Sequence, residues 1–225
     1  MSSTAAGSSP DGARNEILAR VRAAKGAAAE AEAPPIPRAY RTEDRRPHEQ
    51  LVALFCERVG DYRAEVERVT GEQLSAAIGK AASRHSAKRL AIPPDLPEAW
   101  RAPELEAVVD EALTPEELDG VDGVITGCML AIAETGTIAL SAGPHEGRRL
   151  LSLVPDLHIC IVDESRIVGT VPEATARLGQ IVRGDRRPLT LISGPSATSD
   201  IELQRVEGVH GPRKLVVLVV EWNAG

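Results

Sequence analysis

The side chains best suited to chemistry are gathered within residues 134–149, which hold a carboxylate, two threonine hydroxyls, a histidine and two guanidiniums. Glu134 begins a polar turn between two short apolar segments, residues 130–133 and 137–140, which are expected to be β-strands. Such groups could bind an anion or take part in nucleophilic or acid–base catalysis. Loops supported by a rigid sheet often carry binding and catalytic residues. We therefore predict that this part of the chain contains the functional site.

Glu134 is the candidate catalytic residue. A carboxylate between two apolar strands is costly to bury unless it is paired. One interpretation is structural: an ion pair with Arg148 or Arg149, or hydrogen bonds to a neighbouring turn. The other is functional: a nucleophile, a general base or an anchor for a ligand. The sequence leaves both interpretations open.

The rest of the turn also has two interpretations. Thr135, Gly136 and Thr137 could form only a hairpin turn, in which the glycine supplies a positive φ. Alternatively, their hydroxyls and N–H groups line a pocket. We count all three as candidate ligand-binding residues.

A second glycine-rich loop, residues 143–147, is expected to open a helix over residues 146–153. This helix would carry Arg148 and Arg149 near its start, where cations oppose the helix dipole. An anionic partner is therefore expected for at least one of them, and Arg148 is counted as a ligand-binding candidate. His145 alone is weak evidence, because a lone loop histidine is more often exposed than catalytic.

A third polar loop, residues 194–200, follows a predicted strand and has capping-box spacing at its end for a short helix over residues 199–202. Ligands of open α/β sheets lie beyond the carboxyl ends of the strands, and helix N-termini attract phosphate and carboxylate. Simple capping would explain part of the pattern. The candidate ligand-binding residues here are Ser196, Thr198 and Asp200. Residues 210–213 are either only a tight turn before the last strand or a further contributor to the same pocket, through His210 or Arg213.

Periodicity predicts the supporting elements. Residues 215–220 are apolar at every position, which is typical of a central strand covered on both faces. Alternating strands and helices indicate an α/β fold with a mostly parallel sheet flanked by helices. We expect the two polar bends, at residues 134–137 and 194–200, to meet over one edge of a single aliphatic sheet. Helices are predicted at residues 13–29, 47–69, 72–83, 146–153 and 171–182 and from Thr114, and further strands at 88–92, 105–109, 157–162 and 189–193.

The first part of the chain differs in composition. Residues 1–46 are predicted to form a flexible tail, a helix and a linker rich in proline and arginine, and residues 47–225 an α/β domain. Proline excludes a helix through the linker. The linker is either a solvated connector or an arm that embraces a partner or covers a site.

Composition excludes several classes. The 225 residues carry a net charge of -7 and few aromatic side chains, which argues against a nucleic-acid partner. No secretory signal and no membrane span are expected. Three cysteines without C-x-x-C spacing predict no disulfide framework and no metal or cluster site, and indicate a reducing cytoplasm. Motifs typical of dinucleotide enzymes, P-loop NTPases, zinc proteases and serine hydrolases do not occur.

Four segments together resemble a known family. They are I-T-G-C-M-L-A-I-A-E-T-G-T-I-A-L at residues 125–140, G-P-H-E-G-R-R at 143–149, L-I-S-G-P-S-A-T-S-D-I-E at 191–202 and G-V-H-G-P-R at 208–213. In order and spacing they are similar to the LUD-domain family, in particular its lactate-utilisation protein C branch. The resemblance covers residues 47–220. Some relatives have an acidic residue, in I-T-G-A-D, where this chain has Cys128-Met129.

The resemblance implies a fold like that of the sugar-phosphate isomerase and CoA-transferase superfamily (NagB/RpiA-like), with an N-terminal helical extension. It also implies a cluster-free component, with no recognisable cofactor motif, of a bacterial system that oxidises L-lactate to pyruvate beside two iron–sulfur proteins of the same operon, in which the clusters are expected. In CoA transferases of related fold a glutamate at a strand end is the nucleophile, so that role for Glu134 rests on analogy of fold alone.

Three functions remain open at this level. The first is an accessory subunit for lactate oxidation that binds a small anionic ligand. The second is a stand-alone enzyme or sensor for a phosphorylated or CoA-linked metabolite. The third is a structural interaction module whose polar loops are only turns.

Overall fold

The computed structural model describes residues 10–26, 35–199, 205–207 and 210–222. Contacts divide the chain into two units, Met1–Tyr40 and Arg41–Gly225. The first unit contains helix α1, Pro10–Lys25, on which Ile17 and Val21 are exposed. The six residues 41–46, which the sequence assigned to the linker, therefore belong by their contacts to the α/β unit.

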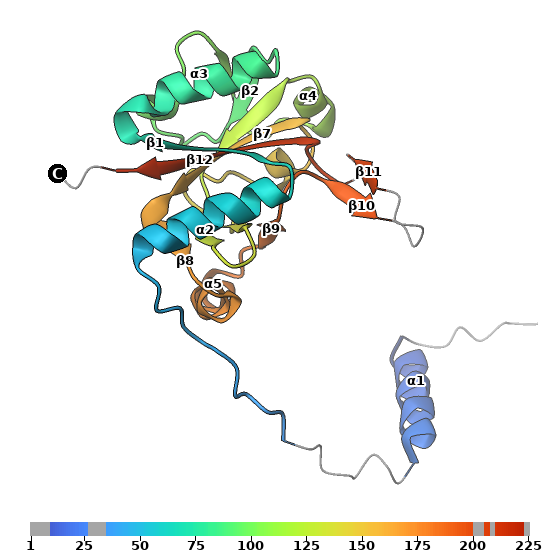
Figure 1. Ribbon diagram of the computed structural model, residues 1–225. Helices are drawn as coiled ribbons and strands as arrows, with labels where there is room; N and C mark the ends of the chain where they lie inside the picture. The colour runs from blue at the N-terminus through green and yellow to red at the C-terminus, as the bar shows by residue number, and fades with distance from the viewer. Residues whose placement is uncertain (1–9, 27–34, 200–204, 208–209, 223–225) are drawn as a thin grey trace, which may run out of the picture. The chain divides into compact units, whose positions relative to one another are not determined.

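Six parallel strands form the main sheet of the second unit, in the order β1-β12-β7-β4-β2-β3 (Figure 1). The mostly parallel sheet flanked by helices confirms the predicted fold class. In chain order the strands are β1 Glu65–Thr70, β2 Arg89–Ile92, β3 Glu106–Val109, β4 Gly123–Thr126, β7 Leu157–Asp163 and β12 Lys214–Glu221.

A second sheet of four short strands has the order β8-β5-β6-β9. It is built on the predicted hairpin, in which β5 Leu130–Ile132 and β6 Thr137–Leu140 pair antiparallel. Strand β8, Ile167–Val168, pairs parallel to β5, and β9, Thr190–Ile192, pairs antiparallel to β6. Strands β10 Ala197–Ser199 and β11 Arg205–Glu207 form a separate antiparallel pair.

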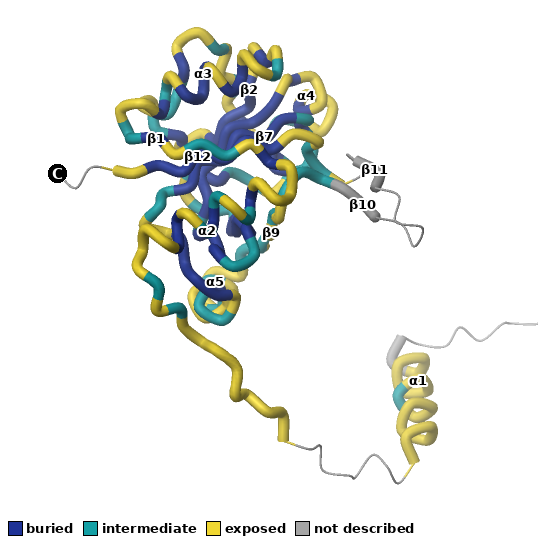
Figure 2. Tube along the Cα trace, viewed as in Figure 1, coloured by how far each residue is buried: buried dark blue, intermediate teal, exposed yellow. Residues whose placement is uncertain are grey.

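The layers follow from the alternation of apolar side chains. In β12, Val216, Leu218 and Val220 pack with helix α3, Leu74–Arg84, whereas the residues between them pack with helix α2, His48–Asp61, and the second sheet. Helix α5, Val171–Asp185, covers the outer face of the second sheet. Figure 1 shows this order from α3 through the sheet to α2 and α5, and Figure 2 shows the buried residues concentrated in the sheet.

The remaining helices are short. Helix α4, Pro115–Asp119, starts at the predicted cap: the hydroxyl of Thr114 accepts the N–H of Glu117 at 3.2 Å. Four 3-10 turns complete the described elements: Gly71–Gln73, Glu98–Trp100, Arg149–Ser152 and Glu164–Arg166.

Three predicted elements differ from the structure. The helix expected over residues 47–69 ends at Asp61, because Arg63 takes a left-handed φ of 67° and the following residues pair with β12. The helix expected over residues 146–153 is only a 3-10 turn, because Gly147 also has a positive φ, 66°. Of the short helix expected at residues 199–202, Ser199 ends strand β10 and the rest lies outside the described residues.

The expectation of a single sheet was also wrong. The hairpin that carries Glu134 belongs to the second sheet, in which β5 and β6 pair antiparallel with each other and with no strand of the main sheet. Among the described residues, no helix is both long and apolar enough to cross a membrane.

Candidate functional site

Glu134 is held by two partners that the sequence did not suggest. Its Oε2 accepts a hydrogen bond from the guanidinium of Arg41 at 2.5 Å, and its Oε1 accepts the backbone N–H of Val171 at 2.9 Å. Val171 is the first residue of α5, where a carboxylate interacts favourably with the helix dipole. The ion pair expected for Glu134 therefore exists, with Arg41 in place of Arg148 or Arg149.

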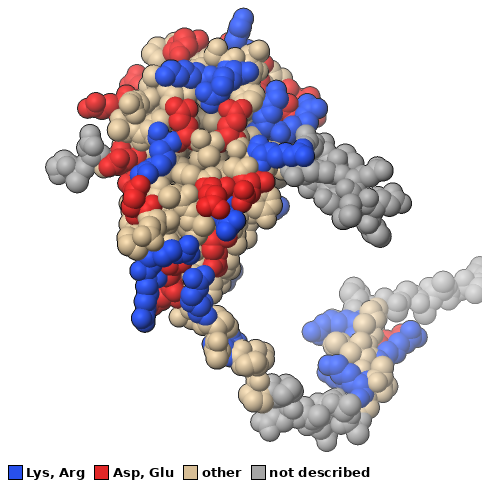
Figure 3. Space-filling model, in the orientation of Figure 1, with Lys and Arg blue, Asp and Glu red and all other residues tan. Residues whose placement is uncertain are grey.

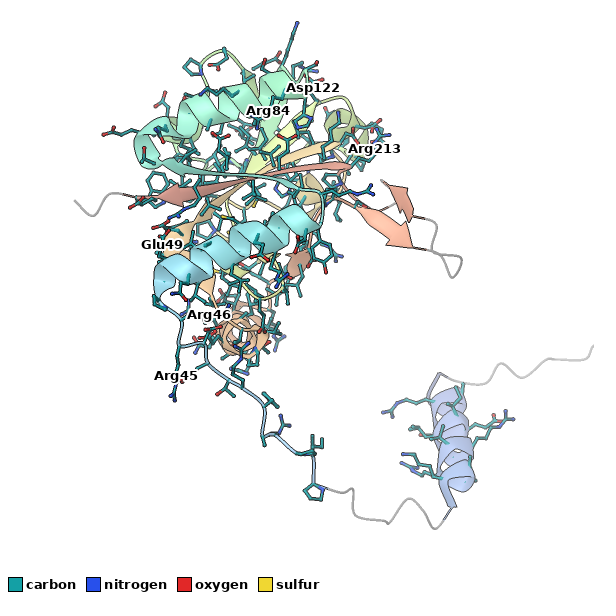
Figure 4. All side chains as sticks on the ribbon, viewed as in Figure 1. Arg45, Arg46, Glu49, Arg84, Asp122 and Arg213 are labelled. Atoms are coloured by element: carbon teal, nitrogen blue, oxygen red, sulfur yellow. The ribbon has the colours of Figure 1, made fainter. Side chains whose placement is uncertain are left out.

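Arg41 belongs to an arm, residues 41–46, that lies against the second sheet and α5. The side chain of Asp44 is 3% exposed and fills the space above Gly169, where a Cβ atom would be 2.0 Å from that of Asp44. Hydrogen bonds from the side chain and backbone of Arg46 hold the pKa of Asp44 well below its usual range. The arm thus covers the surface beside Glu134. Figure 4 labels Arg46 on this arm, below α2.

The hydroxyls of the turn form a chain that leads away from Glu134. The hydroxyls of Thr135 and Thr137 lie 2.8 Å apart, and Thr137 is 2.8 Å from the hydroxyl of Ser193. Gly136 has the expected positive φ, 60°, and approaches the backbone of α2 at Arg58. This geometry favours the hairpin-turn interpretation for Gly136, and it links the two threonines to the loop that follows β9.

Arg148 is engaged in the structure rather than free for a ligand. Its Nε and one terminal nitrogen donate to the carboxylate of Asp110 at 2.7 and 2.8 Å, and it also donates to the carbonyl of Leu113. Burial by itself would raise the pKa of Asp110, but the hydrogen bonds from Arg148 and from the N–H of Leu113 outweigh it and lower that pKa. Arg149, by contrast, has no ion pair or side-chain hydrogen bond within the described part of the chain.

The other predicted bend, residues 194–200, was expected at the carboxyl ends of the strands. Its described part lies instead at the amino ends of the parallel strands of the main sheet. Ser196 donates its N–H to the carbonyl of Pro212, and its hydroxyl accepts the N–H of His210, just before β12 begins. These contacts place the loop that follows β9 at the amino end of β12. The cavity that Ser196 lines does not include Glu134 or Arg148. Asp200 and the side chain of Thr198 lie outside the described residues.

At the carboxyl ends of the parallel strands, the loop over residues 141–147 is strained. Ala142 and His145 have left-handed φ angles of 52° and 63°, which residues with a Cβ rarely adopt. Glu146, 1% exposed, holds the loop, because its carboxylate accepts the N–H groups of Ser141 and Gly143. Such strain persists where the surroundings enforce it, and it is concentrated at functional sites.

This loop places His145 against residues that follow β2 and β4. Asp95 accepts the backbone N–H of His145 at 2.8 Å on its carboxylate, and its carbonyl oxygen is 2.6 Å from Nδ1 of the ring. The ring meets Trp100 edge to face at 5.3 Å, and Trp100 stacks on Trp222 at 5.8 Å. The carbonyl of His145 accepts the N–H of Gly127 at 2.7 Å. The carboxyl ends of three strands therefore support this histidine.

The contact with Asp95 predicts the tautomer of His145. A carbonyl oxygen can only accept, so Nδ1 must carry the proton and Nε2 is left as the free acceptor in the neutral ring. We expect long-range ¹H–¹⁵N correlation spectra of the neutral ring to show the Nδ1–H form for His145, assigned with His145→Gln. The exposed His48 serves as a reference ring. A spectrum with the proton on Nε2 of His145 would contradict this geometry.

A pocket of about 320 Å³ opens at the same carboxyl ends, and we call it the carboxyl-edge pocket. One of its walls is apolar, formed by Met129, Leu130 and Pro144. Arg166 is fixed by a hydrogen bond of 3.0 Å to the carbonyl of Cys128. Arg177, on α5, makes no ion pair or side-chain hydrogen bond with the described residues. The complete lining is Met129, Leu130, Pro144, Glu146, Ser165, Arg166 and Arg177.

This arrangement can bind a small anion that has an apolar end. Guanidinium groups offer paired N–H donors that match a carboxylate, and the apolar wall suits a methyl group. Within the described ranges, no group of three or more His, Cys, Asp or Glu side chains is placed to hold a metal ion. The two guanidiniums and the apolar wall support anion binding beside a strained loop.

The sequence interpretation missed Arg166 and Arg177. Each stands alone in an ordinary element, so only the position of ligand sites at the carboxyl ends of parallel strands could have suggested them. Figure 3 shows that basic and acidic side chains are interspersed over the visible face of the molecule, so charge alone does not distinguish these two.

The fold and this pocket define an α/β protein of the open-sheet type, with its candidate ligand site at the carboxyl edge. A family model described as the LUD domain matches residues 52–220, and the chain belongs to this LUD-domain family.

Relatives agree with this assignment. "Lactate utilization protein C" of Deinococcus radiodurans is 48% identical over 172 residues, which cover 76% of this chain and 80% of the relative. The protein of the same name from Halalkalibacterium halodurans is 29% identical over 191 residues, 77% of this chain and 80% of its own. The crystal structure of a DUF162 family protein from Deinococcus radiodurans has a TM-score of 0.69 and 40% identity, and the match covers 78% of this chain and 99% of that one.

Proposed function

We propose that this protein is the cluster-free component of a bacterial system that oxidises L-lactate to pyruvate, and that it binds a small monocarboxylate in the carboxyl-edge pocket. The observation that carries the proposal is the pair of guanidiniums, Arg166 and Arg177, beside an apolar wall at the carboxyl ends of the parallel strands. Lactate and pyruvate have the required chemistry, since each joins one carboxylate to a methyl-bearing carbon.

The two arginines have different states in the free protein. Arg166 is already oriented by the carbonyl of Cys128, whereas Arg177 has no described partner. Glu146 also borders the pocket, but its carboxylate accepts backbone N–H groups of its own loop. A carboxylate ligand would therefore supply the missing partner of Arg177. Met129, which stands where some relatives have an acid, makes the adjoining wall apolar and favours a methyl over a hydroxyl group.

The wider role rests on the relatives. Two of them carry the printed name "Lactate utilization protein C", which supports a role associated with lactate utilisation. We propose the iron–sulfur proteins of the same operon as partners and the cytoplasm as the compartment. The three cysteines are free, as is usual for a reducing compartment.

Replacing Arg177 tests the proposed pocket. Hydrogen bonds to a charged group contribute roughly 1.5–3 kcal/mol, so Arg177→Gln is expected to weaken binding of L-lactate and pyruvate by about 10–100-fold. Arg183→Gln, on the same helix but outside the pocket lining, is the matched control and should leave affinity unchanged. Isothermal titration calorimetry measures both. Equal affinities for the two variants would show that the ligand binds elsewhere.

A thermal-shift screen separates this proposal from the alternatives. A ligand at 100 times its Kd should add ~2.7 kcal/mol to the free energy of unfolding. Stabilisation by lactate or pyruvate supports the proposal, whereas stabilisation only by sugar phosphates or CoA esters would favour a stand-alone enzyme or sensor. Co-purification with the operon partners, followed by lactate-oxidation assays with and without this chain, tests the accessory role. An unchanged rate and no co-purification would contradict it.

A further inference from the structure

A second cavity lies at the other end of the main sheet, where β7 and β12 begin. It has two compartments, of about 260 and 890 Å³, and His210, Gly211 and Leu153 line both of them. We call the two together the amino-edge cavity. Neither compartment shares a lining residue with the carboxyl-edge pocket. Figure 4 labels Arg213, which lines the larger compartment, at this end of the sheet.

The smaller compartment is rich in hydroxyls. Ser152 is 4% exposed and donates to the carbonyl of Arg149 at 3.0 Å, so its oxygen lone pairs remain available. The hydroxyl of Ser193 ends the chain that begins at Thr135, and that of Ser196 accepts the N–H of His210 at 3.1 Å. Since each serine uses only part of its hydrogen-bonding capacity, the compartment can still donate to and accept from the hydroxyls of a ligand.

A buried histidine completes this wall. His158 is 1% exposed, and its Nε2 lies 2.8 Å from the hydroxyl of Thr126. It alternates along β7 with Leu157 and Ile159, which face α3, so its side chain is directed to the opposite face, where the compartment lies. A polar ring fixed in this way gives the back of the compartment a defined hydrogen-bonding group.

The larger compartment is lined by charged side chains. Arg213 is paired with Asp156 at 2.5 Å, so these two charges compensate each other. Arg149 lines the same compartment and has no side-chain partner among the described residues. Asp119, the last residue of α4, is the opposing charge on this wall. Arg149 is thus the cation that an anionic ligand group can engage.

We propose that the amino-edge cavity binds a small polyhydroxylated molecule that carries one anionic group, a phosphate or a carboxylate. The smaller, hydroxyl-lined compartment binds the polyol part of the ligand. Arg149, in the larger compartment, binds the anionic group, and His210 and Gly211 line both compartments. Lactate matches this cavity less well, because its methyl group cannot use the hydrogen-bonding capacity that Ser193 and Ser196 have left. The site is therefore distinct in place and in ligand from the carboxyl-edge pocket.

Four small ligands separate the required features. Glycerol 3-phosphate and glycerate combine hydroxyls with an anionic group, glycerol lacks the charge, and inorganic phosphate lacks the polyol. We expect one or both of the first two to bind, with the last two at least 10-fold weaker, as measured by calorimetry on the full chain. The stronger of the first two identifies the anionic group. No binding by either, or binding by phosphate as tight as by glycerol 3-phosphate, would overturn the proposal.

Variants locate the ligand. Arg149→Gln should weaken binding at least 10-fold and Ser193→Ala several-fold, whereas Asp119→Asn should strengthen it because an opposing charge is removed. Arg84→Gln, on α3 outside the cavity, and Arg177→Gln, in the carboxyl-edge pocket, should bind normally. Normal binding by Arg149→Gln would overturn the proposal. Lactate binding is tested by replacing Arg177, and polyol binding is tested by replacing Arg149. A negative result for one proposed site is therefore distinguishable from a negative result for the other.

Discussion

Replacing Arg148 with leucine is expected to lower the free energy of unfolding by about 3 kcal/mol, whereas the same change at the adjacent Arg149 is expected to lower it by less than about 0.5 kcal/mol. Asp110, whose side chain is 2% exposed, would lose the two hydrogen bonds from Arg148 and remain buried with its charge. Removing one partner of a buried pair costs roughly 3–5 kcal/mol, and the lower end applies because Arg148 is 39% exposed.

Urea denaturation of both variants at pH 7 measures this difference. The pKa of Asp110 is lowered in the folded protein, so the stability that it contributes is present above its unfolded pKa of about 3.9 and is lost as pH falls through the lower folded value. The difference in the free energy of unfolding between wild type and Arg148→Leu should therefore become smaller below pH ~4. Equal stabilities of Arg148→Leu and Arg149→Leu at pH 7 would contradict the assignment of a structural role to Arg148 alone.

These two arginines illustrate what sequence can and cannot resolve at the site. The expected anionic partner exists for Arg148, although the helix from which it was argued is only a 3-10 turn, and the pattern did not show which arginine would be paired. That choice depends on Asp110, which is 38 residues away in the chain and reaches Arg148 only because β3 is part of the sheet. In the same way, Glu134 meets Arg41 across 93 residues. The sequence shows directly which residue types are present, whereas the topology of the fold determines which of them become partners.

Some elements of the fold could likewise be predicted from the sequence, whereas others could not. Strand β12 was predictable because residues 215–220 are apolar throughout, and such a run is stable only when both faces are covered. Residues 65–69 were misassigned because Val66 continues the apolar stripe of the preceding helix, four residues after Tyr62, whereas Val66 and Val69 lie on opposite faces of strand β1. The pairing of β1 with β12 decided the outcome, together with the left-handed Arg63. Neither feature is visible in a local window of sequence.

Replacing Gly136 with alanine is expected to lower the free energy of unfolding by about 2–5 kcal/mol. A left-handed backbone costs an alanine roughly 1–2 kcal/mol, and an extra atom in a packed contact costs roughly 1–3 kcal/mol. Both apply here, since φ is 60° and a Cβ atom would lie 2.7 Å from the carbonyl carbon of Arg58 and 2.8 Å from the nitrogen of Val59. Helix α2 could accommodate it only by moving away from the hairpin.

Gly184→Ala is the matched control, because no atom lies within 4 Å of its Cβ position and its φ is not positive. We expect that variant to be as stable as wild type, or more stable by up to about 1 kcal/mol. Gly136→Asn separates the two contributions, since asparagine tolerates the left-handed region but has the same Cβ atom. It should therefore recover only part of the loss. Were Gly136 instead a ligand contact, Gly136→Ala would keep its stability and lose affinity, and denaturation midpoints read beside lactate titrations distinguish the two cases.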